Sequence, residues 1–431
     1  DGLTVTRVRP EAVVLPRSTD EVSGVVRLLH GARIPVVPRG AGTGLSGGAV
    51  PLAGGVVVAL VRMRRILGID LENRTATVEA GLVNDRLTKA ADGFGLLFAP
   101  DPSSQRVCTI GGNIAENASG PHCHKNGPTG RHVLALTVVL PDGEIVRIGA
   151  ESDGPGYDLV GLWLGSEGVF GIVTEAVVRL LPRPSAVRTL LANYTDLAAA
   201  CEAVSSIVRA GIIPVAMELI DGVTMRAVEP FARAGFPADA AASLLIELDG
   251  RPEEVEAEHP RVERILREAG AREVRIASTD EDRARLWAGR KLALAAYGRV
   301  NRCYYMMDGV VPRRRLAEVM RKTLEIGSRH RVVIANISHA GDGNLHPNIL
   351  FDDRVPGEFE RVLAASNEIL DACLDAGGSL TGEHGVGHEK REHMRRMFQA
   401  SDLAWFDRVR RIFDPDGRMN PGKVLPEGVR A

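Results

Sequence analysis

Two glycine-rich segments in the C-terminal half of the chain concentrate its reactive side chains. They are HAGDGNLHPN, with His339, Asp342, His346 and Asn348, and TGEHGVGH, with Glu383 and His384. Two imidazoles and a carboxylate can surround a divalent ion and leave positions open for a substrate. His339 and His346 are too far apart for the helical HExxH pattern, so their rings would have to approach across a turn between adjacent strands. The alternative is that each histidine is a solvated or hydrogen-bonded loop residue.

A third candidate is the loop GTGLSG, residues 42–47, which matches the dinucleotide-binding fingerprint G-x-G-x-x-G. That fingerprint requires a helix to open at the glycines. Here Pro51, Gly54 and Gly55 follow, and then the β-branched run VVVALV, so we expect a strand and disfavour a nicotinamide dinucleotide site. The loop can still cradle phosphates with its backbone N–H groups. An ordinary glycine-rich turn is the alternative that the motif alone leaves open.

The composition excludes several classes of protein. Of 431 residues, 45% are hydrophobic and 25% are charged, and the net charge of −2 gives no basis for nucleic-acid binding. The five cysteines form no C-x-x-C pair, so an iron–sulfur cluster is not expected. No apolar run is long enough for a transmembrane segment. The odd, unpatterned number of cysteines suits a reducing compartment. We therefore expect a cytoplasmic protein that could associate peripherally with the inner membrane.

The elements that would position these residues fall into two patterns. Up to Pro184, short strands, the capping box Ser18-x-x-Glu21, a hairpin at Asp142-Gly143 and a long structureless stretch at 98–130 are expected. Beyond it, strands at 190–194, 214–220, 243–249, 304–311 and 332–340 alternate with helices at 196–209, 252–269, 280–297, 312–329 and 353–376. This alternation predicts a second domain of the α+β, split βαβ type.

Seven motifs in this order together resemble one family. They are PRGAGTGLSGG, DPSS, TIGGNIAENASG, GSEGVFGIVTEA, HAGDGNLHPN, GEHGVG and FDPDGRMNPGK. The chain is similar over nearly its whole length to the FAD-linked D-2-hydroxy acid dehydrogenases of the vanillyl-alcohol oxidase type, within the group of the glycolate oxidase D subunit and D-lactate dehydrogenase. The resemblance implies an α+β fold. It places a two-subdomain, PCMH-type FAD-binding domain at 1–184, a ferredoxin-like substrate or cap domain with the metal site at 185–385, and a helical C-terminal segment at 386–431 that returns to the FAD-binding domain.

The resemblance also implies which residues bind FAD, with the loop of residues 38–48 at the pyrophosphate. The loop contains neither His nor Cys, so we expect the FAD to be noncovalent. The cofactor-binding residues implied are Pro38, Arg39, Gly40, Ala41, Gly42, Thr43, Gly44, Leu45, Gly48, Pro100, Asp101, Pro102, Ser103, Thr109, Gly111, Gly112, Asn113, Ala115, Asn117, Ser119, Gly120, Glu167, Gly171, Ile172 and Asn420.

The remaining implied roles concern the reaction. A divalent metal, expected to be zinc, would be held by His339, His346 and Glu383. Asn348 would touch the substrate, and His384 would be the base. Arg290, in the predicted helix LWAGRK, would hold the substrate carboxylate, because arginine binds carboxylates in a bidentate fork. Without the resemblance, an arginine in such a helix is most often a surface charge. Oxidation of a 2-hydroxy acid needs loss of the hydroxyl proton and transfer of a hydride to flavin N5, and these residue types suit it.

The expected function is therefore FAD-dependent oxidation of a D-2-hydroxy acid to the 2-oxo acid. Relatives specific for 2-hydroxyglutarate are expected to carry a lysine near Met306 and a hydroxyl at Leu294, so D-lactate, glycolate or another substrate with a small or apolar tail is favoured. Electrons would pass to an external acceptor other than NAD: a quinone, an electron-transfer flavoprotein, a cytochrome or an iron–sulfur subunit. The chain could be a homodimer or a complex subunit. The alternatives are a non-catalytic electron-relay or assembly subunit, and a D-2-hydroxyglutarate dehydrogenase.

Overall fold

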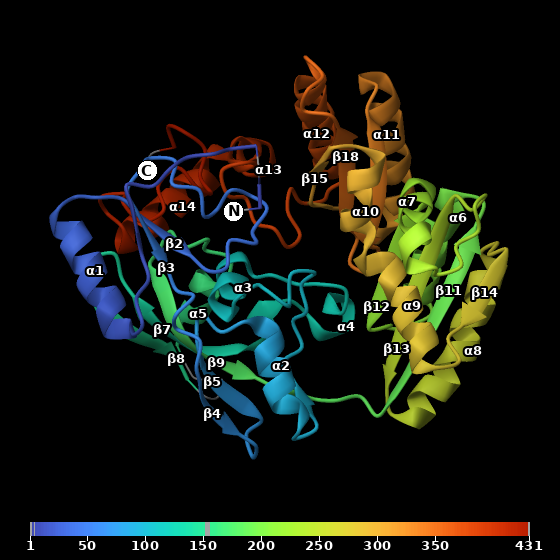
Figure 1. The fold of residues 1–431 in the computed structure, drawn as a ribbon, viewed down its shortest axis with the longest axis horizontal. Coiled ribbons are helices and arrows are strands. Elements are labelled where there is room, and N and C mark those ends of the chain that lie inside the picture. Colours follow the sequence, from blue (N-terminus) through green and yellow to red (C-terminus); the bar gives the residue numbers. More distant parts are fainter. Residues whose placement is uncertain (1, 4, 151–155, 430–431) are drawn as a thin grey trace. The chain divides into compact units, whose positions relative to one another are not determined.

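A computed structural model describes residues 2–3, 5–150 and 156–429. The chain forms two compact units (Figure 1). The first comprises Asp1–Gly120, Asn126–Arg183 and Glu383–Ala431, and the second comprises Pro121–Lys125 and Pro184–Gly382. Both units mix helices and strands, as the α+β expectation requires.

The first unit begins with a three-stranded parallel sheet in the order β1-β3-β2. Its strands are β1 (Ala12–Val14), β2 (Val36–Arg39) and β3 (Val56–Ala59). Between β1 and β2 runs helix α1 (Thr19–Gly31), whose first turn is capped by the Ser18 side chain accepting a hydrogen bond from the N–H of Glu21. The predicted helix start at Ser18 is confirmed.

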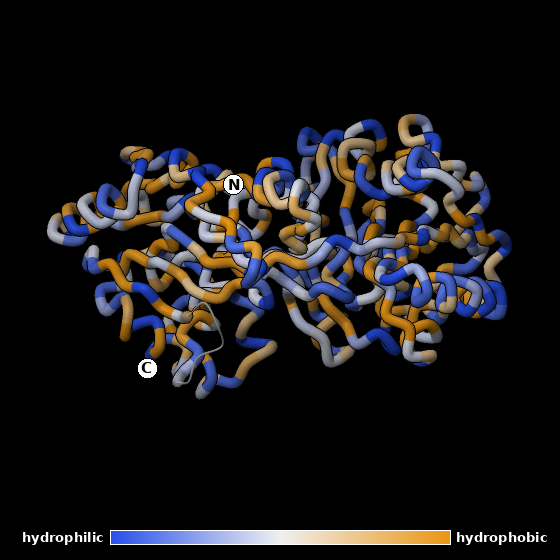
Figure 2. Tube along the Cα trace, turned by 90° about the horizontal axis from the view of Figure 1, so that it is seen from below, coloured by the Kyte–Doolittle hydropathy of each residue, from blue (hydrophilic) through white to orange (hydrophobic). Residues whose placement is uncertain are grey.

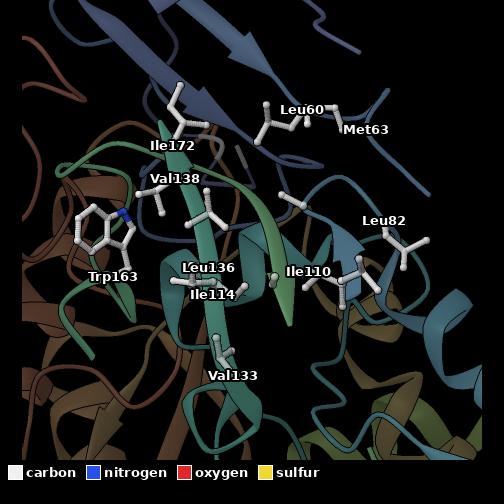
Figure 3. Packing of buried hydrophobic residues seen from close by; sticks show 14 of the residues in the cluster. Leu60, Met63, Leu82, Ile110, Ile114, Val133, Leu136, Val138, Trp163 and Ile172 are labelled. Atoms are coloured by element: carbon white, nitrogen blue, oxygen red, sulfur yellow. The ribbon is translucent and has the colours of Figure 1, made fainter. Parts of the chain in front are cut away.

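A five-stranded antiparallel sheet forms the second layer of this unit, in the order β4-β5-β9-β7-β8. Its strands are β4 (Ile66–Asp70), β5 (Thr75–Glu79), β7 (Val133–Val139), β8 (Ile145–Gly149) and β9 (Ile172–Arg179). The turn at Asp142-Gly143 joins β7 to β8, so the predicted hairpin is confirmed. Buried side chains of this sheet and its helices, among them Leu136, Val138 and Trp163, form one apolar cluster (Figure 3).

The stretch 98–130 is not structureless, contrary to the expectation. It contains helix α3 (Ile110–Glu116), helix α4 (Cys123–Asn126) and a 3₁₀ turn at Thr129–His132. Thr109 caps α3, and Asn117 ends it in the left-handed conformation with φ of 50°. The adjacent Gly111 and Gly112 lower the helix propensity of the segment, whereas burial of Ile110 and Ile114 in the apolar cluster stabilises it (Figure 3).

Shorter elements complete the first unit. They are α2 (Asn84–Asp92), β6 (Leu96–Leu97) paired with β10 (Leu181–Pro182), α5 (Leu159–Trp163), α13 (Met394–Met397) and α14 (Ala400–Phe413). After α14 the chain forms a bridge between Met419 and Val36 of β2, where the N–H of Asn420 donates to the carbonyl of Val36 at 2.7 Å. This pairing brings Asn420 beside the start of β2.

The second unit is built on an eight-stranded antiparallel sheet in the order β14-β11-β13-β12-β17-β18-β15, with β16 also paired to β18. The strands are β11 (Ala186–Tyr194), β12 (Ala216–Asp221), β13 (Ala242–Gly250), β14 (Glu273–Ile276), β15 (Cys303–Met306), β16 (Gly309–Val310), β17 (Val333–His339) and β18 (Asn344–Phe351). Strand β13 lies between β11 and β12 in the sheet, so the predicted split βαβ arrangement is present.

Helices cover both faces of this sheet (Figure 1). One face packs against α6 (Leu197–Arg209), α8 (Pro252–Glu268), α11 (Leu316–His330) and α12 (Glu358–Asp375). The other packs against α7 (Gly222–Ala232), α9 (Asp280–Lys291) and α10 (Ala293–Val300). Helix α7 and strand β14 were not expected, and β18 was expected only, without bounds, as the strand after the turn that follows His339. The helix expected at 280–297 is two helices divided at Leu292.

Hydrophobic and hydrophilic residues alternate over short lengths along the trace (Figure 2). Within the described ranges, no helix has the length and apolar character needed to cross a membrane.

Candidate active site

The glycine-rich loop follows β2 and leads to β3, not to a helix. The absence of a helix in the described segment between these strands confirms that GTGLSG is not a turn of the Rossmann type. Gly42 has φ of 75°, where a side chain would be strained and would meet the Arg39 guanidinium. A side chain at Gly40 would lie 2.5 Å from the Thr109 hydroxyl. The loop is thus packed closely against the start of α3, with glycines where a side chain would be crowded.

The other residues expected to bind FAD occupy the same unit, around this loop and α3. Thr109, Gly111, Gly112, Asn113 and Ala115 form the cap and body of α3, and Asn117, Ser119 and Gly120 follow it. Pro100, Asp101, Pro102 and Ser103 precede α3, and a side chain at Gly120 would collide with the Asp101 carbonyl. Ile172 is the first residue of β9, and Gly171 directly precedes it. Asn113 is buried with its amide bonded to Asn84 and Cys108, which makes it a scaffold of α3.

Asn420 joins three of these segments. Its Nδ2 donates to the carbonyl of Gly48 at 2.9 Å and to the carbonyl of Glu167 at 2.7 Å. The N–H of Glu167 donates in turn to the carbonyl of Ala115. The glycine loop, α3 and the turn before β9 are therefore one hydrogen-bonded assembly, closed by the C-terminal segment.

The Glu167 carboxylate binds the backbone of the GEHGVG segment. Its Oε1 accepts from the N–H of Val386 at 2.6 Å and its Oε2 accepts from the N–H of Gly387 at 2.7 Å. Burial raises the pKa of Glu167 to about 7, although these two donors and the charges of Lys390 and Lys423 oppose the rise. Burial likewise lowers the pKa of Lys423 to about 8. A buried acid with a pKa near neutrality therefore anchors this segment.

Glu383 and His384 precede the anchored segment and belong to the same unit. Glu383 Oε2 accepts a hydrogen bond from the Ser119 hydroxyl at 2.9 Å, and Glu383 Oε1 lies 3.5 Å from His384 Nε2. The pair thus places an imidazole, a ring type that can act as a general base, beside a carboxylate oxygen.

In the second unit, the hairpin of β17 and β18 brings His339 and His346 together. Their ring centroids are 5.1 Å apart with the ring planes nearly perpendicular. Ile337 lies opposite His346 and Asn344 lies opposite His339, so the two rings are diagonal neighbours on one face of the sheet. The seven-residue spacing thus places both imidazoles together across a turn, as the sequence predicts.

A buried carboxylate that sequence analysis missed, Glu218 of β12, organises this face. Glu218 lies directly opposite His339 in the β12–β17 pair, and its Oε1 is 2.7 Å from His339 Nδ1. Its Oε2 accepts from Nε of Arg290, on α9, at 2.6 Å. Burial alone would raise the pKa of Glu218, but its interactions with His339 and Arg290, which include hydrogen bonds to both, hold it below its ordinary value. The signal in the sequence was a glutamate within the apolar strand PVAMELI, since buried carboxylates are rare unless paired.

Asp308 is a second missed carboxylate, fully buried within MMDGVV. It accepts hydrogen bonds from the Asn344 amide, the Thr381 hydroxyl and the N–H of Gly382. His346 Nδ1 is 4.0 Å from Asp308 Oδ1 and 3.1 Å from the carbonyl of Met307. Asp308 therefore fixes the turn that enters β18 and the end of the segment that precedes Glu383.

Asn348 lies on the same face of β18 as His346, with Nδ2 bonded to the carbonyls of His346 and Ala335. Its buried Oδ1 has no hydrogen-bond partner among the described residues, so this acceptor is available to a ligand. Met306 of β15 is its cross-strand partner, and Leu294 packs on the apolar cluster of the same face. The side chains of Met306 and Leu294 carry neither a charge nor a hydroxyl that could pair with the second carboxylate of a dicarboxylate substrate.

Comparison with known proteins agrees with this architecture. Residues 183–424 match the family of FAD linked oxidases, C-terminal domain, and residues 10–149 match the FAD binding domain family. The chain is 46% identical to the glycolate oxidase subunit GlcD of Escherichia coli (strain K12), over 99% of this chain and 86% of that protein. It is 35% identical to the D-lactate dehydrogenase of Anaerostipes hadrus, over 97% of this chain and 90% of that protein.

The fold is also that of a solved structure, the 4-ethylphenol oxidase from Gulosibacter chungangensis in complex with isoeugenol. The TM-score is 0.81 at 20% identity, covering 100% of this chain and 93% of the other. The expected PCMH-type α+β architecture is confirmed. With both family matches and full-length relatives in hand, the chain belongs to the FAD-linked oxidases.

Proposed function

We propose that this FAD-linked oxidase oxidises a D-2-hydroxy acid with a small or apolar tail, such as D-lactate or glycolate, to the 2-oxo acid. The relatives named as a glycolate oxidase subunit and a D-lactate dehydrogenase support this substrate class. The observation that carries the proposal is the buried guanidinium of Arg290, only 4% exposed. Among the described residues, its one hydrogen-bond acceptor is Glu218, so its terminal N–H groups can hold a substrate carboxylate.

We propose noncovalent FAD in the first unit, and a divalent metal, expected to be zinc, bound by His339, His346 and Glu383. The donor chemistry of the residues fits a metal. In both imidazoles Nδ1 faces an oxygen atom, Glu218 Oε1 for His339 and the Met307 carbonyl for His346, so each ring would bind a metal through Nε2. When bound, the metal supplies a Lewis acid that lowers the pKa of the substrate hydroxyl, and FAD supplies the two-electron acceptor.

The chain's own residues then have distinct tasks. Arg290 binds the substrate carboxylate, and the Asn348 amide orients the substrate beside it. His384, placed beside Glu383, takes the hydroxyl proton, since an imidazole titrates near neutrality. The backbone of residues 38–48 binds the pyrophosphate where glycines leave room for it. Met306 and Leu294 give no charge for a second carboxylate, which favours a monocarboxylate over D-2-hydroxyglutarate.

The test is an anaerobic reduction of the flavin. The protein is loaded with FAD and zinc and mixed with D-lactate or glycolate, and the visible absorption of the flavin is followed, with L-lactate as the stereochemical control. We expect the D-hydroxy acid to bleach the flavin, chelation to abolish the bleaching and added zinc to restore it. A bound flavin that no hydroxy acid bleaches would refute the proposal and favour an electron-relay or assembly subunit.

The physiological acceptor is proposed to be external and different from NAD. The support is the glycine loop, which leads to β3 and not to a helix that could bind a dinucleotide pyrophosphate. Reoxidation of the reduced flavin by a quinone analogue, an electron-transfer flavoprotein, a cytochrome or an iron–sulfur subunit would identify the class, with NAD expected to be inactive. Reoxidation by NAD alone would refute this part of the proposal.

A further inference from the structure

Glu218 contacts two of the residues proposed for the reaction, His339 and Arg290. One oxygen of its carboxylate faces His339 Nδ1 at 2.7 Å and the other accepts from Arg290 Nε at 2.6 Å. All three side chains are buried, so water competes little for these bonds. The two partners lie 121 and 72 residues from Glu218 in the sequence, and both bond to its carboxylate.

The contact with His339 decides which ring nitrogen can bind a metal. A carboxylate can only accept, so His339 must carry its proton on Nδ1. The neutral ring then presents a lone pair at Nε2, which is the form that ligates a metal. If the group facing Nδ1 were a donor, the proton would move to Nε2 and the ring could not ligate.

The contact with Arg290 decides where the guanidinium points. Its Nε–H is directed to Glu218, and the planar group is therefore held with its two terminal nitrogens on the side away from Nε. A rotamer-rich side chain held in one orientation loses less entropy when a carboxylate binds. The same bond compensates much of the charge of an otherwise buried cation.

We propose that Glu218 is a positioning residue for both the metal and the substrate carboxylate, acting through His339 and Arg290. The inference rests on the proposed function and adds to it a link between the two ligands. It has a specific consequence. A glutamine at this position has one acceptor and one donor and can satisfy only one partner in the way a carboxylate does.

The orientation of that glutamine can be deduced from the partners. Arginine cannot accept a hydrogen bond, whereas imidazole can exchange its tautomer at little cost. In Glu218→Gln the amide oxygen therefore faces Arg290 and the NH₂ group faces His339. Metal binding should be damaged and carboxylate binding largely preserved. In Glu218→Ala neither partner is held, and both should be damaged.

The experiment uses the full FAD-loaded chain and two ligands that report separately. Zinc affinity is measured by competition with a chromophoric chelator. Carboxylate affinity is measured from the shift that propionate, which lacks the hydroxyl, produces in the flavin spectrum. We expect Glu218→Gln to lower zinc affinity by about 10–100-fold, as loss of such an outer partner does, and to change propionate affinity by less than about threefold, well within one decade. Glu218→Ala should lower both affinities about tenfold or more.

Glu247 provides a matched control. It lies on the neighbouring strand β13, is equally buried, and accepts hydrogen bonds from Thr189, Arg283 and Trp287. Glu247→Gln should leave both affinities at the parent value, because none of these donors has a role in the proposed reaction. If Glu247→Gln reproduced the zinc loss of Glu218→Gln, the effect would be general destabilisation and the inference would be overturned.

The outcomes separate this inference from the proposed function. A parent chain that binds neither zinc nor propionate refutes the proposed function, and the inference with it. A parent chain that binds both while Glu218→Gln retains the parent zinc affinity overturns the inference alone. If Glu218→Ala binds propionate as tightly as the parent does, the part of the inference that concerns Arg290 is overturned. If the alanine variant is not recovered folded, Glu218→Asp, which withdraws the carboxylate by one methylene, replaces it with the same two affinities measured.

Discussion

Replacing Glu167 with glutamine is predicted to remove a pH dependence from the stability of the chain. Burial raises the pKa of this carboxyl from 4.5 to about 7, against the N–H groups of Val386 and Gly387 and the charges of Lys390 and Lys423. The folded chain therefore binds the proton more tightly than the unfolded chain. The stability this contributes is fully present below pH 4.5 and is lost as the pH rises towards 7. Each unit of pKa corresponds to about 1.4 kcal/mol, so the loss amounts to about 3 kcal/mol.

The assay is urea unfolding of the parent and of Glu167→Gln with excess FAD, at several pH values between 4.5 and 7. The variant loses a carboxylate that accepts two short hydrogen bonds, so it should be less stable at the upper end of the range by about 1–3 kcal/mol for each bond that is not replaced. The difference in the free energy of unfolding between parent and variant should nevertheless decrease by about 3 kcal/mol from the lower to the upper pH. Glu79→Gln, which neutralises another buried carboxylate of the first unit, is the control for a general effect.

A gap that stayed constant or widened with pH would show that Glu167 is ionised throughout the range. The two N–H donors and the two lysines would then outweigh burial, and the reasoning from burial would be wrong. Equal narrowing in Glu79→Gln would assign the effect to buried carboxylates in general.

The remaining predictions concern the cofactor, the base and the substrate. Gly42→Ala should weaken FAD binding about tenfold, because a φ of 75° costs an L-residue about 1–2 kcal/mol; fluorescence titration measures this, and Gly24→Ala, in the open middle of α1, should bind FAD like the parent. His384→Ala should keep FAD bound and slow flavin reduction by a substrate at least about 10²-fold; stopped-flow reduction at the parent rate would exclude His384 as the base. Met306→Lys should raise kcat/KM for D-malate relative to D-lactate, since it places a cation opposite Asn348 in the β15–β18 pair; an unchanged ratio would show that this strand does not face the substrate tail.

Local sequence determined those parts of the fold that are fixed by interactions between residues close in the sequence. The Ser18 cap and the Asp142-Gly143 hairpin form where their motifs lie, because each is completed by residues within a few positions. Pro51, Gly54 and Gly55 excluded a helix after the glycine loop for the same reason. Helix α3 was missed because its glycines disfavour it locally, and burial in the apolar cluster overrides that preference.

The family, the FAD requirement and the list of reactive residues were also available from sequence, through motifs that recur in a set order. Family matches over both halves of the chain confirm the family and the cofactor. The seven-residue spacing of His339 and His346 indicated a turn between strands, and the β17–β18 hairpin has that form. The roles assigned to these residues remain proposals for the experiments above.

Only the tertiary structure revealed which buried carboxylates hold those residues. Glu218 lies opposite His339 because β12 pairs with β17, and Glu167 meets Val386 and Gly387 across 219 and 220 residues of sequence. Strand order and burial are set by the packing of the whole unit. The partner of a single glutamate in an apolar strand therefore cannot be predicted from the local sequence. The sequence by itself therefore determined the chemistry that this chain can offer, whereas the order of the strands decided how its charges are held, since buried charges are stable only beside partners that the fold brings to them.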